Sequence, residues 1–284
     1  MRFTHLAEQI YCRPWLITPE AHASIRMVFE RALASGLHEP RAEEMSLLDM
    51  FPKRRALAID DETGIASIHV MGPLGKNLSK LEQSCGATGM EQIRGDYAKA
   101  LDQGARGILL DFDSPGGTIT GTPELAALIA EKRVPTVAYT EDIMASAAYY
   151  LAAGADAIFA SPSASVGSIG VYIPWMDTSA ALEARGMKPD PIVNTGGDLK
   201  ASGFGGKLSD VQRAHLQEEV DTIFEDFKEH VLNFRQVDAG AMRGQVLSGR
   251  QALNANLVDR LGDRSQAFNA LARTLSAGSK QSAA

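Results

Sequence analysis

The feature that most constrains the fold is an alternation of short apolar runs with helical intervals between Gly107 and Tyr172. A short continuous apolar run bounded by glycine and proline is typical of a strand buried in a parallel sheet. The alternation predicts strand 108–112, helix 123–132, strand 136–139, helix 145–153 and strand 157–160. Strand–helix–strand units of this kind close with a right-handed crossover. The segment therefore predicts an α/β fold built on a parallel sheet.

Two turns in this segment carry residues suited to chemistry. Ser146 stands at the start of a helix that follows a strand, where the positive end of the helix stabilises developing negative charge. An ordinary N-cap serine fits the same position. Gly116 and Gly117 follow the first strand, where glycine either forms a plain turn or lets a backbone amide approach a ligand closely. Neither turn identifies a site on its own.

Three motifs in sequence order resemble those of the signal peptide peptidase A (SppA) family of serine peptidases. They are Ser-Pro-Gly-Gly at 114–117, Ala-Ser-Ala-Ala-Tyr-Tyr at 145–150 and Gly-Ser-Ile-Gly-Val at 167–171, within a resemblance that covers roughly residues 64–270. The usual family form has two glycines after the serine, where this chain has Ala147 and Ala148. The resemblance implies an α/β, crotonase/ClpP-like fold of repeated ββα units with a parallel sheet and flanking helices. We expect no cofactor.

The resemblance assigns the nucleophile to Ser146 and the base to Lys200. A serine hydroxyl needs a base to take its proton, and no histidine lies within the three motifs. In SppA-like enzymes the base is a lysine in a Gly-x-x-Lys-(Ala/Ser)-x-Gly loop, a pattern that residues 197–203 match. A lysine base must be neutral, and burial in an apolar site lowers a lysine pKa from about 10.4. Lys188 and Lys207 are the local competitors for this role.

The resemblance also assigns the groups that orient the base and bind the oxyanion. Ser168, in the Gly-Ser-Ile-Gly motif, would hold the lysine amine, although a serine in a turn also satisfies backbone groups. The oxyanion hole would consist of the amide of Gly116 or Gly117 together with the amide of Ala147. Losing one such donor typically slows catalysis by about 10²–10³-fold.

The composition excludes several classes of function. The net charge is −7 with acidic and basic residues interspersed, so the chain lacks the footprint of a nucleic-acid-binding protein. Cys12 and Cys85 lie far apart without ligand-like spacing, so no metal is expected and a reducing compartment fits. No apolar stretch is long enough to span a bilayer, and the N-terminus lacks the apolar run of a signal peptide. We therefore expect a cytoplasmic protein. The phage head-maturation branch of the family, which the segment beginning at Pro14-Trp15 resembles, implies the host-cell cytoplasm or a phage procapsid.

The sequence predicts three parts. Residues 1–52 are expected to form an N-terminal arm with a helix that begins at Thr18-Pro19-Glu20. Residues 53–275 are expected to form the SppA-like peptidase domain, and the small, polar residues 276–284 a disordered tail. The Pro14-Trp15 entry to the arm resembles the phage head-maturation branch of the family.

Three further segments bear on the site and on assembly. A capping box at 209–212 predicts a long helix, whose apolar face needs a core or a partner. Together with the arm, this face predicts a homo-oligomer, in which a neighbouring subunit could supply the base. Residues 191–193 are predicted to be a strand, and residues 72–89 either a mobile flap or a solvated loop.

These observations favour a Ser–Lys endopeptidase that cleaves scaffold or capsid protein during phage procapsid maturation. The first alternative is a cytosolic protease of the signal-peptide-peptidase type that degrades peptides. The second is a non-catalytic scaffold-binding protein in which Ser146 and Lys200 are vestigial. An acyl-CoA enzyme of the crotonase fold is more remote, because it leaves the Ser–Lys pairing without a purpose.

Overall fold

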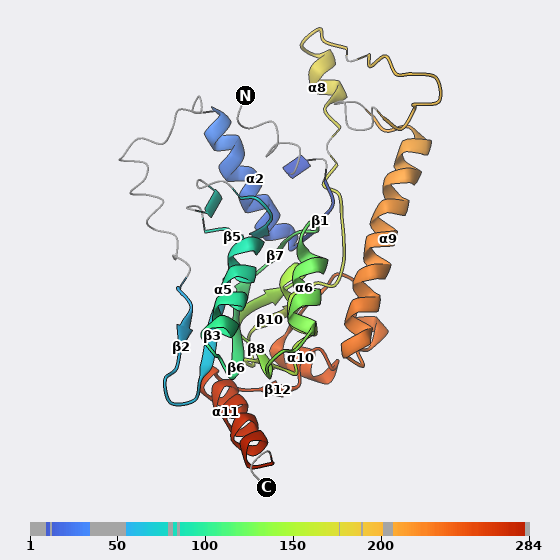
Figure 1. Cartoon of the computed structure of the whole chain (residues 1–284). Helices are drawn as coiled ribbons and strands as arrows, with labels where there is room; N and C mark the ends of the chain where they lie inside the picture. Colours follow the sequence, from blue (N-terminus) through green and yellow to red (C-terminus); the bar gives the residue numbers. More distant parts are fainter. Residues whose placement is uncertain are drawn as a thin grey trace. The chain divides into compact units, whose positions relative to one another are not determined.

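The computed structural model describes residues 10–11, 13–34, 55–78, 82–83, 86–175, 177–188, 190–200 and 207–281 (Figure 1). The chain forms two compact units. The smaller unit comprises Met1–Trp15 and Val171–Asp226, and the larger comprises Leu16–Gly170 and Phe227–Ala284. Ser146 therefore belongs to the larger unit and Lys200 to the smaller one.

The larger unit is built on a main sheet whose central strands are parallel. Its strands are β2 (Ala58–Ile59), β3 (Ile65–Met71), β6 (Gly107–Ser114), β8 (Thr136–Ala145), β9 (Ala157–Ala160), β10 (Ser165–Gly167), β11 (Val246–Ser248) and β12 (Arg260–Leu261). They lie in the order β11-β10-β8-β6-β3-β2, and β9 pairs with both β8 and β12. Strands β3, β6, β8, β9 and β10 pair in parallel, while β2 and β11 are antiparallel to their neighbours. The predicted parallel sheet is confirmed.

A second, smaller sheet contains β1 (Trp15–Ile17), β7 (Gly116–Thr118), β4 (Leu74–Gly75) and β5 (Thr88–Gly89), in that order. Two strands of the main sheet, β3 and β6, are each followed by strands of the small sheet and then by a helix. Strand β3 precedes β4, β5 and α5, and strand β6 precedes β7 and α6. This repeated ββα order is the one that the resemblance implies.

Helices pack against the main sheet in two groups (Figure 1). The helical elements of the larger unit are α2 (Pro19–Ala34), α5 (Met90–Asp102), α6 (Thr122–Ala130), α7 (Ala147–Ala153), the 3-10 turn η1 (Ala239–Ala241), α10 (Gly249–Asn254) and α11 (Arg264–Gln281). Helix α6 contacts both α5 and α7, which themselves contact the main sheet, and α11 contacts β6 and β8. The helix predicted to begin at Thr18 is confirmed as α2, with the Ala21 amide donating to Thr18 Oγ1 at 3.4 Å.

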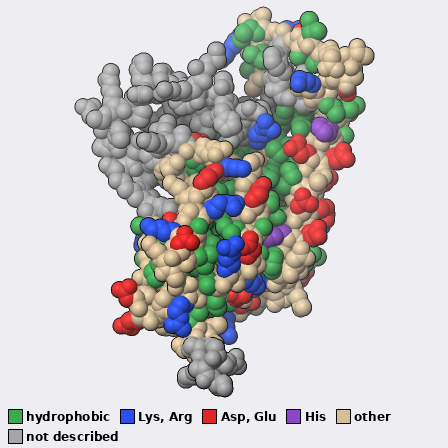
Figure 2. Space-filling view, in the orientation of Figure 1, with side chains coloured by type: hydrophobic (Ala, Val, Ile, Leu, Met, Phe, Trp, Pro, Cys, Tyr) green, Lys and Arg blue, Asp and Glu red, His purple; other side chains and the backbone are tan. Residues whose placement is uncertain are grey.

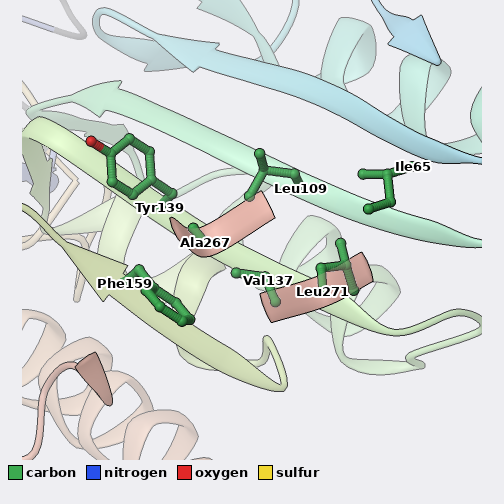
Figure 3. Close-up of a cluster of buried hydrophobic side chains, with 7 residues drawn as sticks. All are labelled: Ile65, Leu109, Val137, Tyr139, Phe159, Ala267 and Leu271. Carbon is green, nitrogen blue, oxygen red and sulfur yellow. The ribbon is translucent and has the colours of Figure 1, made fainter. Parts of the chain in front are cut away.

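A cluster of buried side chains lies between the main sheet and α11 (Figure 3). Its members are Ile65, Leu109, Val137, Tyr139 and Phe159 from four neighbouring strands, and Ala267 and Leu271 from α11. The intervening strand residues Ile68 and Leu110 are fully buried as well. Both faces of the central strands are therefore covered, as expected for a parallel sheet.

A charged network ties the start of α11 to the sheet. Arg264 donates from Nε to Oδ2 of Asp111 at 2.8 Å, and His69 Nδ1 lies 3.3 Å from the same oxygen. Arg264 also donates from Nη2 to Ser67 Oγ at 2.9 Å. Burial by itself raises the pKa of Asp111, but the hydrogen bonds from His69 and Arg264 outweigh it, so the pKa is lowered. The carboxylate therefore stays ionised beneath α11.

The described part of the smaller unit has few buried residues. Trp15 and Tyr172 form an antiparallel bridge, in which the Trp15 amide donates to the Tyr172 carbonyl at 2.9 Å. The unit also contains α8 (Ser179–Glu183) and the start of α9 (Asp210–Phe234), which continues into the larger unit. From residue 183 to residue 200, every described residue except Gly197 is exposed. Figure 2 shows acidic side chains gathered along α9 and charges of both signs elsewhere on the visible face.

The capping box predicted for the long helix is confirmed. Ser209 Oγ accepts from the Gln212 amide at 3.2 Å, and Gln212 Oε1 accepts from the Ser209 amide at 3.1 Å. The predicted apolar face is buried at Phe227 and Val231, near the C-terminal end of α9.

Other local predictions are wrong. Residues 191–193 form no strand and Ile192 is 98% exposed, because a β-branched pair needs a neighbouring strand for its hydrogen bonds. Helix α11 continues to Gln281, so residues 276–281 are helical, since extending an existing helix is easier than starting one. Of the two alternatives for residues 72–89, the solvated loop is wrong, because these residues contribute the buried strands β4 and β5, and the mobile flap stays a prediction. Residues 1–9, 12 and 35–52 of the predicted arm lie outside the described residues, as do residues 53–54 and 282–284.

Candidate active site

Ser146 lies at the junction of β8 and α7. Strand β8 ends at Ala145 and α7 begins at Ala147, so the predicted place at a helix start is confirmed. The Ser146 backbone has φ 54° and ψ −117°. Residues other than glycine rarely adopt a positive φ, and holding one costs about 1–3 kcal/mol. The amide of Ser146 donates to the Gly167 carbonyl at 2.7 Å, which helps to hold this conformation.

The Ser146 hydroxyl is buried without a hydrogen-bond partner among the described residues. The residue is 0% exposed, and its Oγ has no partner in this part of the chain. Leaving a buried polar group unpaired costs about 1–3 kcal/mol, and most buried groups in proteins are paired. An ordinary N-cap serine would accept a bond from an amide of the first helical turn, but Ser146 makes no such bond. The hydroxyl is therefore not used as a cap.

The loop after β6 brings Gly116 against Ser146. Gly116 has φ 104°, and a Cβ on it would lie 2.1 Å from the Leu16 carbonyl oxygen and 2.9 Å from the Ser146 Cβ. A Cβ on Gly117 would lie 2.0 Å from the Leu74 carbonyl oxygen. Both positions therefore require glycine because of close backbone approach, and the pair lies beside the candidate nucleophile.

Ser114, the last residue of β6, has contacts here that the sequence did not predict. Its fully buried hydroxyl donates to the Gly72 carbonyl at 2.7 Å and accepts from the Gly116 amide at 3.3 Å. The Gly116 amide therefore already has a partner within the fold. The sequence marks Ser114 only as the first residue of the Ser-Pro-Gly-Gly motif. It does not show that the hydroxyl bonds the Gly72 carbonyl, 42 residues earlier in the chain.

Ser168 lies beside Ser146. Strands β8 and β10 pair in parallel, with Ala145 opposite Gly167. These are the last residues of the two strands, so Ser146 directly follows β8 and Ser168 directly follows β10. Ser168 also has a positive φ of 53° and is 5% exposed. Its amide donates to the Gln245 carbonyl at 2.8 Å. The structure thus brings the second and third sequence motifs together at the ends of adjacent strands.

A bulge in β8 precedes this junction. Phe112 pairs with Thr140, but Ser114 pairs with Met144, so three residues of β8 lie opposite one residue of β6. Bulges of this kind are common beside active sites, where they redirect a strand. Burial and then the charge of Asp142 raise the pKa of Asp113. The predicted strand 136–139 is confirmed, and it continues through the bulge to Ala145.

Lys200 lies in the smaller unit and is exposed. Its amide donates to the Gly197 carbonyl at 2.9 Å within a turn. The Gln212 Nε2 donates to the Asp198 carbonyl at 2.8 Å, which ties this turn to the start of α9. Residues 201–203, the rest of the predicted lysine loop, lie outside the described residues. The other predicted site residues, Ser146, Ser168, Gly116, Gly117 and Ala147, all belong to the larger unit.

In the part of the chain that the structure describes, no group of three or more His, Cys, Asp or Glu side chains could hold a metal ion. No described helix is both long and apolar enough to cross a membrane.

Three of the curated proteins that resemble this chain bear on its function. The chain is 28% identical to capsid assembly protease C of Escherichia phage lambda, covering 96% of this chain and 66% of the relative. It is 29% identical to head-tail preconnector protein GP5 of Enterobacteria phage P21, covering 78% and 46%. It is 32% identical to an Enterococcus faecium protein provisionally named signal peptide peptidase SppA, covering 60% and 51%. The chain thus spans about half to two thirds of the length of these relatives.

A solved structure is also similar. It is a mutant of the 1510-N membrane-bound stomatin-specific protease in complex with a substrate peptide, with a TM-score of 0.38 and 14% identity over 72% of this chain and 76% of that one.

The family model described as Peptidase family S49 matches residues 129–277. The matched region contains Ser146, Ser168 and Lys200. The resemblance to SppA-like peptidases and their phage branch is confirmed by this match and by the relatives. Because the matched region takes up more than half of the chain, the chain belongs to peptidase family S49.

Proposed function

We propose that this chain is a serine endopeptidase in which Ser146 is the nucleophile and Lys200 is the general base. The observation that carries the proposal is the state of Ser146. Its hydroxyl is fully buried and has no hydrogen-bond partner among the described residues, and its backbone has a positive φ. Such a costly arrangement persists only where the surrounding structure enforces it, and it is common at active sites. Membership of family S49 supports the same role.

In the proposed reaction, the Lys200 amine takes the hydroxyl proton as Ser146 Oγ attacks the carbonyl carbon of a peptide bond. The protonated amine then gives this proton to the leaving nitrogen as the C–N bond breaks, which leaves an acyl ester on Ser146. A water molecule attacks the ester while the amine takes the water proton. That proton passes to Ser146 Oγ as the ester bond breaks, which restores the hydroxyl and the neutral amine.

The remaining groups have supporting roles in this proposal. The oxyanion would accept hydrogen bonds from the amides of Gly117 and Ala147. Gly116 stays an alternative donor, although its amide donates to Ser114 in this structure. Ser168 would hold the Lys200 amine, because its position beside Ser146 suits a group that orients the base.

We propose a phage scaffold or capsid protein as the substrate. The support is the similarity to proteins named capsid assembly protease C and head-tail preconnector protein GP5, the first of which aligns with 96% of this chain. A protease that degrades released signal peptides is the second candidate, favoured by the similarity to the SppA-named protein. The proposed active form is a homo-oligomer in the host cytoplasm or procapsid, with residues 53–275 as its peptidase domain.

The test of the nucleophile uses a fluorophosphonate probe, which forms a covalent bond with an activated serine. Wild-type protein should be labelled at Ser146, as read by peptide mass spectrometry. Ser146→Ala should keep its circular dichroism spectrum and lose both labelling and turnover of a casein-like substrate. A wild-type protein that is neither labelled nor active, yet binds scaffold protein, would favour the non-catalytic alternative.

A second experiment separates the substrate classes. Wild-type protein is incubated with candidate scaffold and capsid proteins and, in parallel, with synthetic signal peptides, and the fragments are identified by mass. Cleavage at defined sites of scaffold or capsid protein supports the phage role. Cleavage of the signal peptides alone supports the second candidate.

A further inference from the structure

Helix α7 is a short, buried element that begins directly after Ser146. All residues of Ala147–Ala153 are buried. At 1.5 Å per residue the helix is about 10 Å long, so a displacement of its C-terminal end is transmitted to its N-terminal end. The last carbonyl groups of a helix have no partner within it. Whatever binds the carbonyls at the end of α7 therefore helps to fix the place of Ser146.

Arg235 binds the last residue of α7 and the segment that follows it. Nε donates to the Ala153 carbonyl at 3.2 Å, and Nη2 donates to the Ala155 carbonyl at 2.8 Å. Nη1 forms an ion pair with the Asp259 carboxylate. Arg235 is only 8% exposed, and a cation so deeply buried is tolerated only with good partners. A planar guanidinium can serve three acceptors in fixed directions, which a lysine ammonium does not reproduce.

Asp259 is itself held in place. Its Oδ2, which receives Nη1 of Arg235, also accepts from the Ile158 amide at 2.7 Å. The Asp259 amide donates back to the Ile158 carbonyl at 2.9 Å. Ile158 lies in β9, the strand that follows α7 along the chain. The guanidinium is therefore anchored to the sheet and holds the end of α7 from there.

The C-terminal turns of α9 add a second contact with α7. The His230 ring stacks on Tyr150 with 4.1 Å between ring centroids, and its Nε2 lies 2.9 Å from the Tyr150 carbonyl oxygen. The Phe227 ring lies against the same tyrosine ring, with 4.8 Å between the ring centroids. Arg235 follows the last residue of α9, and its amide donates to the Val231 carbonyl at 2.8 Å. One helix end therefore holds α7 both along its side and at its terminus.

We propose that Arg235 is a positioning residue for Ser146. It lies outside the three motifs and acts by fixing the C-terminal end of α7, from which the position of the nucleophile follows. The inference rests on the proposed function of Ser146. A misplacement of about 1 Å at a reacting group costs on the order of 10²-fold in rate, so catalysis is more sensitive than folding to a small tilt of α7.

The test compares the rate at which a fluorophosphonate probe labels Ser146 in the wild-type chain and in Arg235→Lys. The lysine keeps the positive charge and removes the three-way hydrogen bonding. Labelling per folded molecule should slow by roughly 10–100-fold. Its dependence on pH should stay that of the wild type, because the base is unchanged. Arg250→Lys, an exposed arginine on α10, is the matched control and should be labelled at the wild-type rate.

A second control separates positioning from a loss of stability. Leu271→Ala removes a side chain from the cluster between α11 and the main sheet, which contains no residue of α7. At a matched fraction of folded protein, Leu271→Ala should be labelled at the wild-type rate. Slowing equal to that of Arg235→Lys would show that stability alone explains the effect and would overturn the inference.

Three other outcomes would decide against the inference. Wild-type labelling rates in folded Arg235→Lys would contradict the inference and leave the proposed nucleophile intact. If Arg235→Lys does not fold, Asp259→Asn is measured instead. It keeps Arg235 and weakens the Nη1 contact, so a severalfold slowing is expected and an unchanged rate would contradict the inference. Failure of the wild type to be labelled at Ser146 would remove the proposed function itself, together with the inference that rests on it.

Discussion

The two residues of the proposed dyad lie in regions of opposite character. Ser146 belongs to a unit in which β8, β10 and α7 are largely buried, and its own side chain is 0% exposed. Lys200 belongs to a segment, residues 183–200, in which every described residue except Gly197 is exposed. The nucleophile is therefore positioned by packing within its own unit. In contrast, Lys200 is held within its own segment only by a backbone turn and remains exposed.

This difference bears on how the proposed site is completed. Desolvation is what makes a lysine able to act as a base, and residues 183–200 do not bury Lys200 by themselves. In the proposed mechanism, Lys200 must be covered by something other than its own segment in the active enzyme.

The largest effect is expected for Lys200→Ala. Turnover of a casein-like substrate should fall by about 10⁴-fold or more, as for Ser146→Ala, and the double mutant should be no worse because paired catalytic groups act as a unit. Lys207→Ala and Lys188→Ala, which change exposed lysines of the same unit, should stay active. An essential Lys207 with a dispensable Lys200 would show that the lysine is wrongly assigned.

The next prediction asks which subunit supplies the base. If the active enzyme is an oligomer with a shared site, mixing inactive Ser146→Ala with inactive Lys200→Ala protein restores some intact Ser–Lys pairs. With random assembly in a ring, about one quarter of the sites should be intact. Activity of the mixture is measured after subunit exchange, with mass spectrometry to show that mixed oligomers form. No recovery in such oligomers would mean that each chain uses its own lysine.

Two glycines with positive φ, Gly116 in the larger unit and Gly186 in the smaller one, allow the backbones of the two units to be compared. Gly116→Ala in the larger unit would place a Cβ at φ +104°, 2.1 Å from the Leu16 carbonyl oxygen. It should lower the free energy of unfolding by about 3 kcal/mol and slow labelling of Ser146 markedly, because the strained backbone cannot relax. Gly186→Ala in the smaller unit adds a Cβ at a φ of +71°, and this Cβ meets no atom of the described residues within 4 Å apart from its chain neighbours. It should cost only about 1 kcal/mol and leave labelling unchanged. Equal effects of the two changes on labelling would contradict the comparison.

The sequence predicted those parts of the fold that depend on local pattern. The apolar runs gave the strands, and Ser146 was placed at the helix start where the structure has it. The missed contacts join residues far apart in the chain, such as Ser114 with Gly72 and Arg235 with Ala153. No periodicity encodes a side chain that reaches a backbone carbonyl 82 residues away.

The wrong predictions share a physical cause. The strand predicted at residues 191–193 was inferred from residue types alone, without a neighbouring strand to pair with. The disorder predicted for residues 276–281 was likewise inferred from their small, polar residues, without regard to the helix that precedes them. The roles of Lys200 and Ser168 stay predictions, as do domain boundaries at residues 52 and 275.

The smallest effect concerns His230, which lies in the contact between α9 and α7. Burial lowers the pKa of His230, although its hydrogen bond with the Tyr150 carbonyl partly opposes this. The folded state therefore binds a proton less readily than the unfolded chain, whose histidines have a pKa of about 6.5. As the pH falls through about 6.5 toward the lower folded pKa, the unfolded state is protonated first and the free energy of unfolding decreases. Above that window the contribution of neutral His230 is fully present.

His230→Gln removes this titration and keeps a side-chain amide that can donate to the Tyr150 carbonyl. The free energy of unfolding, measured by urea titration between pH 8 and pH 5, should fall less steeply in the variant than in the wild type. The difference in slope should stay below about 1.4 kcal/mol per pH unit, which is the limit for one proton. If His230→Gln keeps the wild-type slope, the partly buried ring does not titrate differently in the folded state, and the contact of α9 with α7 is less well shielded from solvent than its geometry indicates.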